Sequence, residues 1–493
     1  MYDISALNFI GGKVKDFLKN NIYFYVLGIV VILGILLRLK GFIINPSFWH
    51  DECALGWNIL HKGYLELFDK LRFLQVAPPL FLVCSKFLVW ALPVKTNASA
   101  CDFVLRMLPF IIGSLSIGVF YYVCKSVFLS KWTTLIAVLL FSLNPVLISY
   151  SFEFKPYIFD VFSTLIVLFI FLNIDFLKIS NKKLWLYGGI LAILPWFSFM
   201  SAIVEFAGFL TLSYKKEAPK KFFLMALPVI LSIFIYLKSF ILKVYEQNSK
   251  GMLNYWQNEF VNKDFSNITQ LNLENMNYFF SNLPFFSCTF FVILMFIGAI
   301  LFFKSGRLRF LFMSVLIEST LILASIMHVY PYSTRLIIFL IPILIIFGVK
   351  IFDIENKILA GILLTFVIIP HLIFGFNFLK LQNLHKGEFA RGLITQIANN
   401  IENQDTVVVN KASNVEFLYY NSFVKLPNKT IFLKSNPTEE LNAFSKGKYW
   451  FYMPYFDKNP KEVNEITKWL EKNSKIIFKA QSVQSTLIHT ILD

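Results

Sequence analysis

The chain has 493 residues, of which 57% are hydrophobic and 18% aromatic, and only 15% are charged. Soluble globular proteins average about 25% charged residues, so this composition excludes an ordinary soluble domain and indicates a polytopic membrane protein. A net charge of +16 would suggest nucleic-acid binding in a soluble protein, but here the basic residues gather in short loops between apolar runs. We therefore expect no nucleic-acid partner.

Apolar runs recur along the first four-fifths of the chain, and about 20 such residues are needed to cross a bilayer. The first run has no small-residue cleavage site after it, so it predicts an anchor rather than a signal peptide. The fifth and sixth runs are short and nearly continuous. We predict eleven spans, at approximately Ile22 to Leu39, Val104 to Cys124, Trp132 to Tyr150, Tyr157 to Ile174, Leu184 to Phe197, Phe199 to Tyr214, Phe222 to Phe240, Phe285 to Phe303, Phe310 to His328, Leu336 to Val349 and Ile358 to Phe378.

Basic residues cluster before the first span and in alternate connections. With eleven spans, all six clusters lie on one side, which the positive-inside rule makes the cytoplasm. This predicts a multi-pass protein of the plasma (inner) membrane, with the other loops and the C-terminal segment extracytoplasmic. The clusters are Lys13, Lys15 and Lys19; Lys125 and Lys131; Lys178, Lys182 and Lys183; Lys215, Lys216, Lys220 and Lys221; Lys304, Arg307 and Arg309; and Lys350 and Lys357.

A polar corner, Asn45 to Trp57, follows the first span and carries the adjacent acids Asp51 and Glu52. Ser47 is a suitable N-cap for a helix whose first turn would hold both acids near the positive end of the helix dipole. Neighbouring helical residues point about 100° apart, so one acid can face a reacting group while the other orients it or holds a cation. Two solvated acids at an interfacial helix start remain the alternative for the pair alone.

The rest of the first outer loop, up to Asp102, contains the apolar run Pro78 to Trp90. This run is short for a span and predicts an interfacial helix; reading it as a span would invert the topology downstream, against the charge pattern. Three cysteines, Cys53, Cys84 and Cys101, share the loop, and a disulfide among them cannot be deduced. No paired CxxC spacing is present, which argues against structural zinc.

Three further outward-facing segments place charged residues beside aromatic ones. Each alone is typical of snorkelling side chains in an aromatic belt, but their convergence on the side of Asp51 indicates a polar site. The segments are Asp102 to Pro109, with Arg106; Ser149 to Tyr157, with Glu153 and Lys155; and His328 to Arg335, with Tyr332 and Arg335.

The last two outer segments differ in composition from the spans. Lys243 to Pro284 is rich in asparagine and aromatic residues, including Leu253 to Gln257, and no residue in it fixes a role. From about residue 381 to 493, strand-like runs alternate with helical ones, which predicts a small soluble α/β domain after a membrane domain of residues 1–380. The predicted strands are Thr406 to Val409, Thr430 to Leu433, Tyr449 to Tyr452 and Lys475 to Phe478.

Four motifs carry a family resemblance over roughly Ile22 to Phe378. In order, they resemble motifs of the GT-C glycosyltransferases, and more closely of the group with protein O-mannosyltransferases, the aminoarabinose transferase of lipid A and bacterial RgtA/B/C/D-like proteins. The chain departs from the family pattern at Phe81, where tyrosine is common, and at Met107-Leu108-Pro109, where Leu-Pro-Ser is common; these departures bear on the substrate. The motifs are Trp49 to Glu52, Ala77 to Phe81, Leu105 to Pro109 and Tyr330 to Arg335.

The resemblance implies an integral membrane glycosyltransferase of the hexosyl or pentosyl class (EC 2.4). Such an enzyme transfers a sugar, with inversion, from a polyprenyl-phosphate donor in the membrane lipid to a glycan, lipid or protein acceptor on the extracytoplasmic side. Some relatives use a divalent metal cation, which leaves room for one at Asp51, Glu52 or Glu153. The resemblance places the catalytic aspartate at Asp51, with Glu52 as its supporting residue. From the chemistry of the transfer, we expect Asp51 to accept the proton of the acceptor hydroxyl and Arg335, Arg106 or Lys155 to neutralise the donor phosphate. Further candidate substrate or metal contacts are His50, Glu153, Tyr157 and Tyr332.

The chemistry fits these residue types. A leaving phosphate, with a second pKa near 6, needs no general acid, so one base is enough, whereas glycoside hydrolysis typically needs two carboxylates. A nucleotide donor is disfavoured, because no Gly-rich phosphate loop and no outward Asp-x-Asp motif is present. One alternative is a transporter or flippase of lipid-linked saccharides. The intramembrane Glu205 and Glu318 favour it, but the lack of internal repeats argues against it. The other alternative is a scaffold that displays the C-terminal domain.

Overall fold

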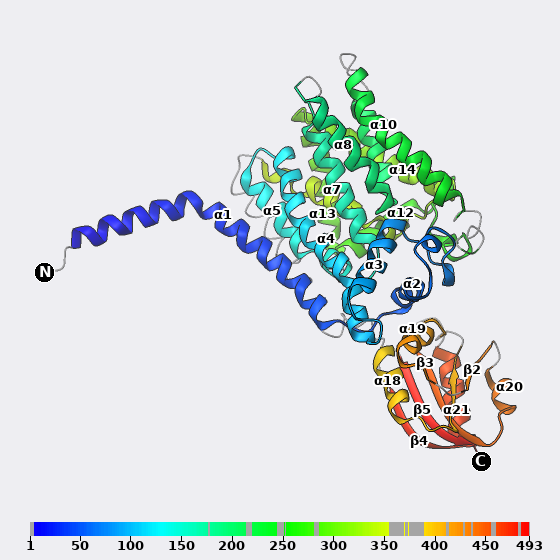
Figure 1. The fold of residues 1–493 in the computed structure, drawn as a ribbon. Coiled ribbons are helices and arrows are strands. Elements are labelled where there is room, and N and C mark those ends of the chain that lie inside the picture. Colours follow the sequence, from blue (N-terminus) through cyan, green and yellow to red (C-terminus); the bar gives the residue numbers. More distant parts are fainter. Residues whose placement is uncertain are drawn as a thin grey trace.

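The chain folds into a bundle of helices followed by a small mixed sheet (Figure 1). The computed structural model describes residues 4–175, 178–212, 219–243, 251, 253–280, 285–353, 369, 373, 389–410, 414–426, 429–434, 437–454, 460–481 and 485–492. The bundle comprises α1 (Ile4–Ile44), α2 (His50–His61), α3 (Pro79–Ala91), α4 (Ala98–Val127), α5 (Lys131–Leu143), α6 (Pro145–Tyr150), α7 (Tyr157–Asn173), α8 (Asn181–Ile193), α9 (Ser201–Leu212), α10 (Pro219–Tyr236), α12 (Ile268–Phe279), α13 (Phe285–Lys304), α14 (Leu308–Ile326) and α15 (Ile341–Val349).

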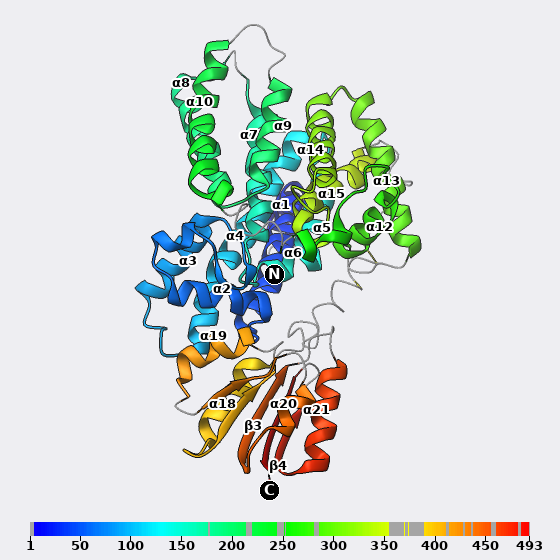
Figure 2. The ribbon, with the colours of Figure 1, turned by 90° about the vertical axis from the view of Figure 1, so that its right-hand side faces the viewer.

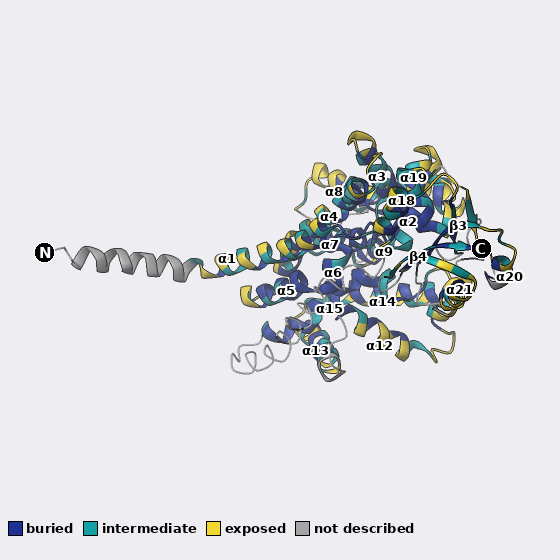
Figure 3. Ribbon diagram, turned by 90° about the horizontal axis from the view of Figure 1, so that it is seen from below, coloured by how far each residue is buried: buried dark blue, intermediate teal, exposed yellow. Residues whose placement is uncertain are grey.

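The bundle has the length and surface of a membrane domain. Large apolar side chains such as Ile29, Phe234 and Phe296 are more than half exposed, and exposed positions run along the outer face of α1 (Figure 3). Apolar surface of this extent suits lipid rather than water, which confirms the predicted helical membrane protein. Five described segments are long and apolar enough to cross a membrane: Asn21–Ile44, Ala98–Val127, Lys220–Ile241, Leu308–Ile326 and Thr334–Asp353.

Other predicted spans vary in how they appear. The fifth and sixth are the separate helices α8 and α9, joined by the 3₁₀ turn η3 (Leu194–Trp196). The eleventh, Ile358 to Phe378, lies outside the described residues apart from single positions.

Most of the basic loops that the sequence assigned to one side contact one another. Arg307, just before α14, bonds the end of α4, and Arg309, in the first turn of α14, bonds the end of α7. Asp353, at the end of the 3₁₀ turn η7 (Lys350–Asp353), accepts from the two residues just before α5. These loops therefore share one end of the bundle. The contacts are Arg307 to Ser126 O (2.7 Å), Arg309 to Phe171 O (2.9 Å) and Ile174 O (3.2 Å), Lys221 to Ile179 O (3.2 Å), and Leu129 N and Ser130 N to Asp353 (3.3 and 3.2 Å).

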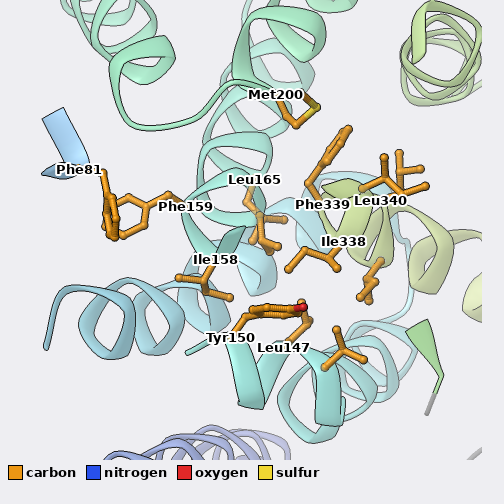
Figure 4. Close-up of a cluster of buried hydrophobic side chains, with 14 of the residues drawn as sticks. Phe81, Leu147, Tyr150, Ile158, Phe159, Leu165, Met200, Ile338, Phe339 and Leu340 are labelled. Carbon is orange, nitrogen blue, oxygen red and sulfur yellow. The ribbon is translucent and has the colours of Figure 1, made fainter. Parts of the chain in front are cut away.

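The opposite end rests on a core contributed by α6, α7 and the 3₁₀ segment η6 (Thr334–Leu340). Figure 4 shows Tyr150, Ile158 and Ile338 among its buried side chains. Tyr150 and Ile158 flank Lys155 in the sequence, and Ile338 follows Arg335 by three residues. Apolar packing thus fixes the backbone on either side of two predicted site residues.

The first outer loop folds into α2 and α3 at this end (Figure 2). The expected helix at Pro78 to Trp90 is α3, with Pro79 in its first turn. The expected N-cap at Ser47 is wrong: the N-cap of α2 is Trp49, whose backbone N–H donates to the Glu52 carboxylate at 3.4 Å. Glu52 therefore satisfies one free donor of the helix start. The cysteines of this loop are free thiols.

The C-terminal sheet has the strand order β2-β1-β3-β5-β4. β1 pairs in parallel with β2 and β3, while β5 lies antiparallel between β3 and β4. All four predicted strands are present, whereas β5 was not predicted, and the predicted domain boundary at residues 380–381 lies outside the described residues. The elements are α18 (Ala390–Asn400), β1 (Thr406–Val409), α19 (Asn414–Val424), β2 (Thr430–Phe432), α20 (Pro437–Asn442), β3 (Gly447–Pro454), α21 (Pro460–Asn473), β4 (Ser474–Gln481) and β5 (Ser485–Leu492).

Candidate active site

Asp51 lies where three separate parts of the chain meet. Its carboxylate oxygen Oδ2 is 3.2 Å from Arg335 Nη1 and 3.5 Å from Lys155 Nζ. Asp51 comes from the first turn of α2, Lys155 from the turn between α6 and α7, and Arg335 from η6. The side chains of Asp51 and Arg335 keep 17% and 20% of their surface exposed, so a ligand can reach them. The structure thus brings together one carboxylate and two cationic side chains that the sequence placed on the same side.

Lys155 is the buried member of this group. Its Nζ donates to Oε1 of Gln75 at 2.8 Å as well as facing Asp51. Burial lowers the pKa of Lys155, and the nearby Arg335 lowers it too, while Asp51 opposes both. The ammonium is thus held by one carboxylate and one amide oxygen, a pair of acceptors in a fixed direction.

Gln75 is a site residue that the sequence did not reveal. It follows two residues with left-handed backbone, Phe73 (φ 64°) and Leu74 (φ 52°), a conformation that costs non-glycine residues energy and often marks functional sites. The side chain of Asn58 in α2 holds this turn by accepting from Arg72 N at 2.9 Å and donating to Arg72 O at 3.2 Å. A strained turn clamped to α2 therefore aims Gln75 at the site.

Glu52 faces away from Asp51 into the protein. Its two carboxylate oxygens accept from Arg106 Nε (3.1 Å) and Nη2 (2.7 Å), and Oε1 also accepts from Phe154 N at 2.6 Å. Arg106 Nη1 donates to Asn45 Oδ1 and Pro46 O. Both side chains are almost fully buried. The structure therefore places Arg106 at Glu52, within the corner, and does not bring it to Asp51.

The donor set at this corner does not suit a divalent cation. Such a cation would need ligand oxygens whose charge is not already neutralised by other cations. Asp51, however, faces the cations Arg335 and Lys155, and Glu52 is bound by Arg106 and a backbone N–H. Glu153 is buried in the neighbouring turn. Across the described ranges, no three His, Cys, Asp or Glu side chains are grouped as metal ligands.

Aromatic side chains lie beside Arg335 and next to Lys155 in the chain. The Arg335 guanidinium carbon is 5.7 Å from the centre of the Trp49 ring and 5.1 Å from that of Trp256, within cation–π range. Tyr157, two residues after Lys155, packs edge-on against Tyr150. The indoles hold the guanidinium from two elements, which restricts the directions in which it can donate.

Tyr332, in contrast, lies in the bundle. Its hydroxyl bonds Glu318 and, at 2.9 Å, Asn272 Oδ1, and its ring is 4% exposed. The structure does not bring Tyr332 to Asp51. Glu318, the acid that favoured the transporter alternative, is thus hydrogen-bonded to Tyr332.

The C-terminal domain contacts the same corner. His50 Nδ1 is 2.9 Å from Glu416 Oε1 of α19, and this residue was predicted only as a substrate or metal contact. Burial lowers the pKa of His50, but the hydrogen bond and charge of Glu416, with the charge of Asp51, outweigh burial and the repulsion of Lys155 and raise it.

Asp102, at the start of α4, also contacts this domain. Its buried carboxylate accepts from Arg391 Nη1 (2.7 Å), Tyr419 (2.8 Å) and Tyr420 (3.0 Å). The Tyr420 hydroxyl also accepts from Phe48 N at 2.7 Å. No sequence pattern pointed to these partners, because about three hundred residues separate them.

Known structures share this arrangement of elements. ArnT from Cupriavidus metallidurans bound to undecaprenyl phosphate aligns over 93% of this chain and 97% of its own, with a TM-score of 0.53 and 10% identity. The Archaeoglobus fulgidus oligosaccharyltransferase in complex with Zn and sulfate aligns over 93% and 72%, with a TM-score of 0.53 and 12% identity. The archaeal oligosaccharyltransferase AglB from Archaeoglobus fulgidus in complex with an inhibitory peptide and a dolichol-phosphate aligns over 96% of this chain and 74% of its own, with a TM-score of 0.51 and 13% identity.

Neither a protein-family model nor a curated protein sequence matches the chain. The likeness therefore concerns the fold. The chain shares the fold of ArnT and AglB, which agrees with the fold expected from its four motifs.

Proposed function

We propose that the protein is a membrane glycosyltransferase that transfers a sugar from a polyprenyl-phosphate donor to an acceptor hydroxyl. The observation that carries the proposal is Asp51 within 3.5 Å of both Arg335 and Lys155, on a fold that ArnT shows with undecaprenyl phosphate bound and AglB shows with a dolichol-phosphate. A base beside two anion-binding groups is what this transfer needs.

The reaction would proceed in one displacement. The acceptor oxygen forms a bond to the anomeric carbon and its proton passes to Asp51. The bond from that carbon to the phosphate oxygen breaks, and its electron pair stays on the polyprenyl phosphate. In-line attack inverts the configuration at the anomeric carbon. No general acid is required, because the phosphate leaves as a stable anion.

The two cations would hold the phosphate as its charge grows. The planar fork of Arg335 suits paired phosphate oxygens, while Lys155 supplies a point charge whose direction Gln75 fixes. Arg106 and Glu52 would act behind the site, because their mutual contacts hold the corner that carries Asp51. His50 would connect this corner to the C-terminal domain.

We further propose that the site faces the extracytoplasmic side. Helix α4 contacts the corner through Arg106 and the basic loops through Ser126, so about twenty residues, or roughly 30 Å of helix, separate the two ends. That length matches the hydrocarbon thickness of a bilayer. If the basic loops are cytoplasmic, as the positive-inside rule requires, Asp51 and the C-terminal domain lie outside.

Transfer by the purified protein tests the proposal. The protein in nanodiscs would be given a panel of undecaprenyl-phosphate hexoses and pentoses together with cell-envelope glycans, lipids and peptides as acceptors. We expect sugar transfer from at least one donor and release of undecaprenyl phosphate. Failure to bind undecaprenyl phosphate at all would contradict the proposal.

A further inference from the structure

An outer segment of the bundle lies against the site without having been given a role. Residues 253–259, called here the aromatic segment, contain Tyr255 and Trp256 and end in the 3₁₀ turn η5 (Gln257–Glu259). Trp256 is partly buried beside Arg335, with its ring centre 5.1 Å from the guanidinium carbon. The ring of Tyr255 is 60% exposed and stands nearly perpendicular to that of Trp256, with the ring centres 4.9 Å apart.

The aromatic segment is fixed to the loop that carries Arg335. Tyr332 N donates to Glu259 O at 2.9 Å, and Tyr332 is three residues before Arg335. Beyond the segment, Val261 N donates to Ser325 Oγ of α14 at 2.9 Å. The two rings therefore keep their place relative to Arg335 through backbone contacts, and not only through the cation–π contact.

The other end of this stretch approaches the turn that carries Gln75. A Cβ atom on Gly251 would lie 3.3 Å from Leu74 Cδ2, so the chain passes close to that strained turn. Gly251 thus lies on the Gln75 side of the site, and residues 253–259 lie on the Arg335 side. A ligand held by Lys155 and Arg335 would lie next to these residues.

The chemistry of the aromatic segment suits a sugar ring. Residues 253–258 carry no charge, and Asn254, Gln257 and Asn258 are exposed. One face of a sugar ring is lined by C–H groups that pack on an aromatic ring, and its edge carries hydroxyls that amide side chains bond. An acyl chain would find no use for the exposed amides, and a second phosphate would find no cation in the segment.

The covalent structure of the donor places its sugar at this position. A single oxygen atom joins the phosphorus to the anomeric carbon, so a phosphate at Arg335 brings the sugar next to Trp256. Resting on the proposed function, we propose that Tyr255 and Trp256 form the subsite for the sugar ring of the polyprenyl-phosphate donor. They then determine which sugar is accepted, separately from the groups that hold the phosphate.

Binding of donors with and without a sugar tests this subsite. Affinities of the full-length protein in nanodiscs would be measured for bare undecaprenyl phosphate and for a panel of undecaprenyl-phosphate hexoses and pentoses. The variants are Trp256→Ala, Trp256→Phe and Tyr255→Ala. Trp256→Phe keeps an aromatic face for Arg335. Trp90→Ala is the control. Trp90 is 65% exposed on α3, so this variant removes an indole from the same end of the bundle but not from the proposed subsite.

We expect Trp256→Ala and Tyr255→Ala to weaken the tightest sugar-bearing donor by about five- to tenfold and bare undecaprenyl phosphate by less than twofold. Trp256→Phe should recover most of the loss, and Trp90→Ala should change neither affinity. Equal losses for both ligands would show that the rings act only through Arg335, and unchanged affinities would show an interfacial aromatic belt. Either result would overturn the subsite while leaving the phosphate site in place. So would a wild-type protein that binds the sugar-bearing donors no more tightly than bare undecaprenyl phosphate. A wild-type protein that binds no polyprenyl phosphate contradicts the proposed function itself.

Discussion

The hydroxyl of Tyr420 accepts the backbone N–H of Phe48 at 2.7 Å, three residues before Asp51. The same hydroxyl donates to Asp102, so one atom of the C-terminal domain joins the polar corner to the start of α4. Tyr419 bonds Asp102 as well but has no bond to Phe48. The C-terminal domain thus serves as part of the support for Asp51, in addition to being a separate sheet.

A pair of matched variants tests this support. Tyr419→Phe and Tyr420→Phe both remove one hydrogen bond to the buried Asp102, worth about 0.5–1.5 kcal/mol. Tyr420→Phe also leaves Phe48 N–H without its acceptor in a buried place, at a further cost of about 1–3 kcal/mol. Denaturant unfolding in detergent should show the larger loss for Tyr420→Phe. Equal losses would mean that the bond to Phe48 contributes nothing.

The ion pair of His50 and Glu416 predicts a pH dependence. Because the folded-state pKa of His50 is raised, its contribution to stability is fully present below the ordinary value of 6.5 and is lost as the pH rises through the folded-state value. The thermal midpoint should therefore fall on the alkaline side of 6.5 by more in wild type than in His50→Gln. Glu416→Gln should remove the same component. Parallel pH profiles for all three proteins would contradict the pair's role.

Glu52 and Arg106 should behave as a buried pair. Removing one partner leaves the other charge buried and alone, which costs about 3–5 kcal/mol, whereas removing both is much less harmful. We expect Glu52→Gln and Arg106→Met each to lower the thermal midpoint strongly, and the double variant to regain most of it. Added divalent cation should rescue none of them. Rescue of Glu52→Gln by a divalent cation would instead indicate a cation site at this corner.

Arg335 should dominate binding of the lipid phosphate. A charge-assisted hydrogen bond contributes about 1.5–3 kcal/mol, so Arg335→Ala should weaken undecaprenyl phosphate by one to two orders of magnitude. Arg335→Lys should not restore the affinity, because lysine lacks the planar fork. Lys243→Ala is the control, since it removes a half-exposed outer charge paired with Asp69. Wild-type affinity in Arg335→Ala would mean that the phosphate binds elsewhere.

The sequence predicted those parts of the site that depend on topology and motif. Counting basic loops placed Asp51, Lys155 and Arg335 on one side, and the family motifs singled out Asp51 and Arg335. The outward or inward direction of a side chain within such a motif was harder to predict. Glu52 and Arg106 both belong to motifs, yet they pair with each other because the 100° offset between Asp51 and Glu52 turns Glu52 towards α4.

Residues whose role depends on contacts distant in sequence were missed. Gln75 reaches Lys155 only because Phe73 and Leu74 adopt left-handed backbone, and neither residue type signals that conformation. Asp102 was predicted only to end the first outer loop, since its partners in α18 and α19 are some three hundred residues away. Strand β5 was missed as well, and its place between β3 and β4 is set by pairing rather than by local propensity.

Sugar transfer by Asp51→Asn is the most direct test of the proposed function. Asparagine keeps the size of the side chain but cannot take the acceptor's proton, so turnover in nanodiscs should fall by about 10² to 10⁴. Undecaprenyl phosphate should bind no more weakly than to wild type, because the change removes a negative charge beside Arg335 and Lys155. Near-wild-type turnover in Asp51→Asn would contradict the assignment of Asp51 as the base.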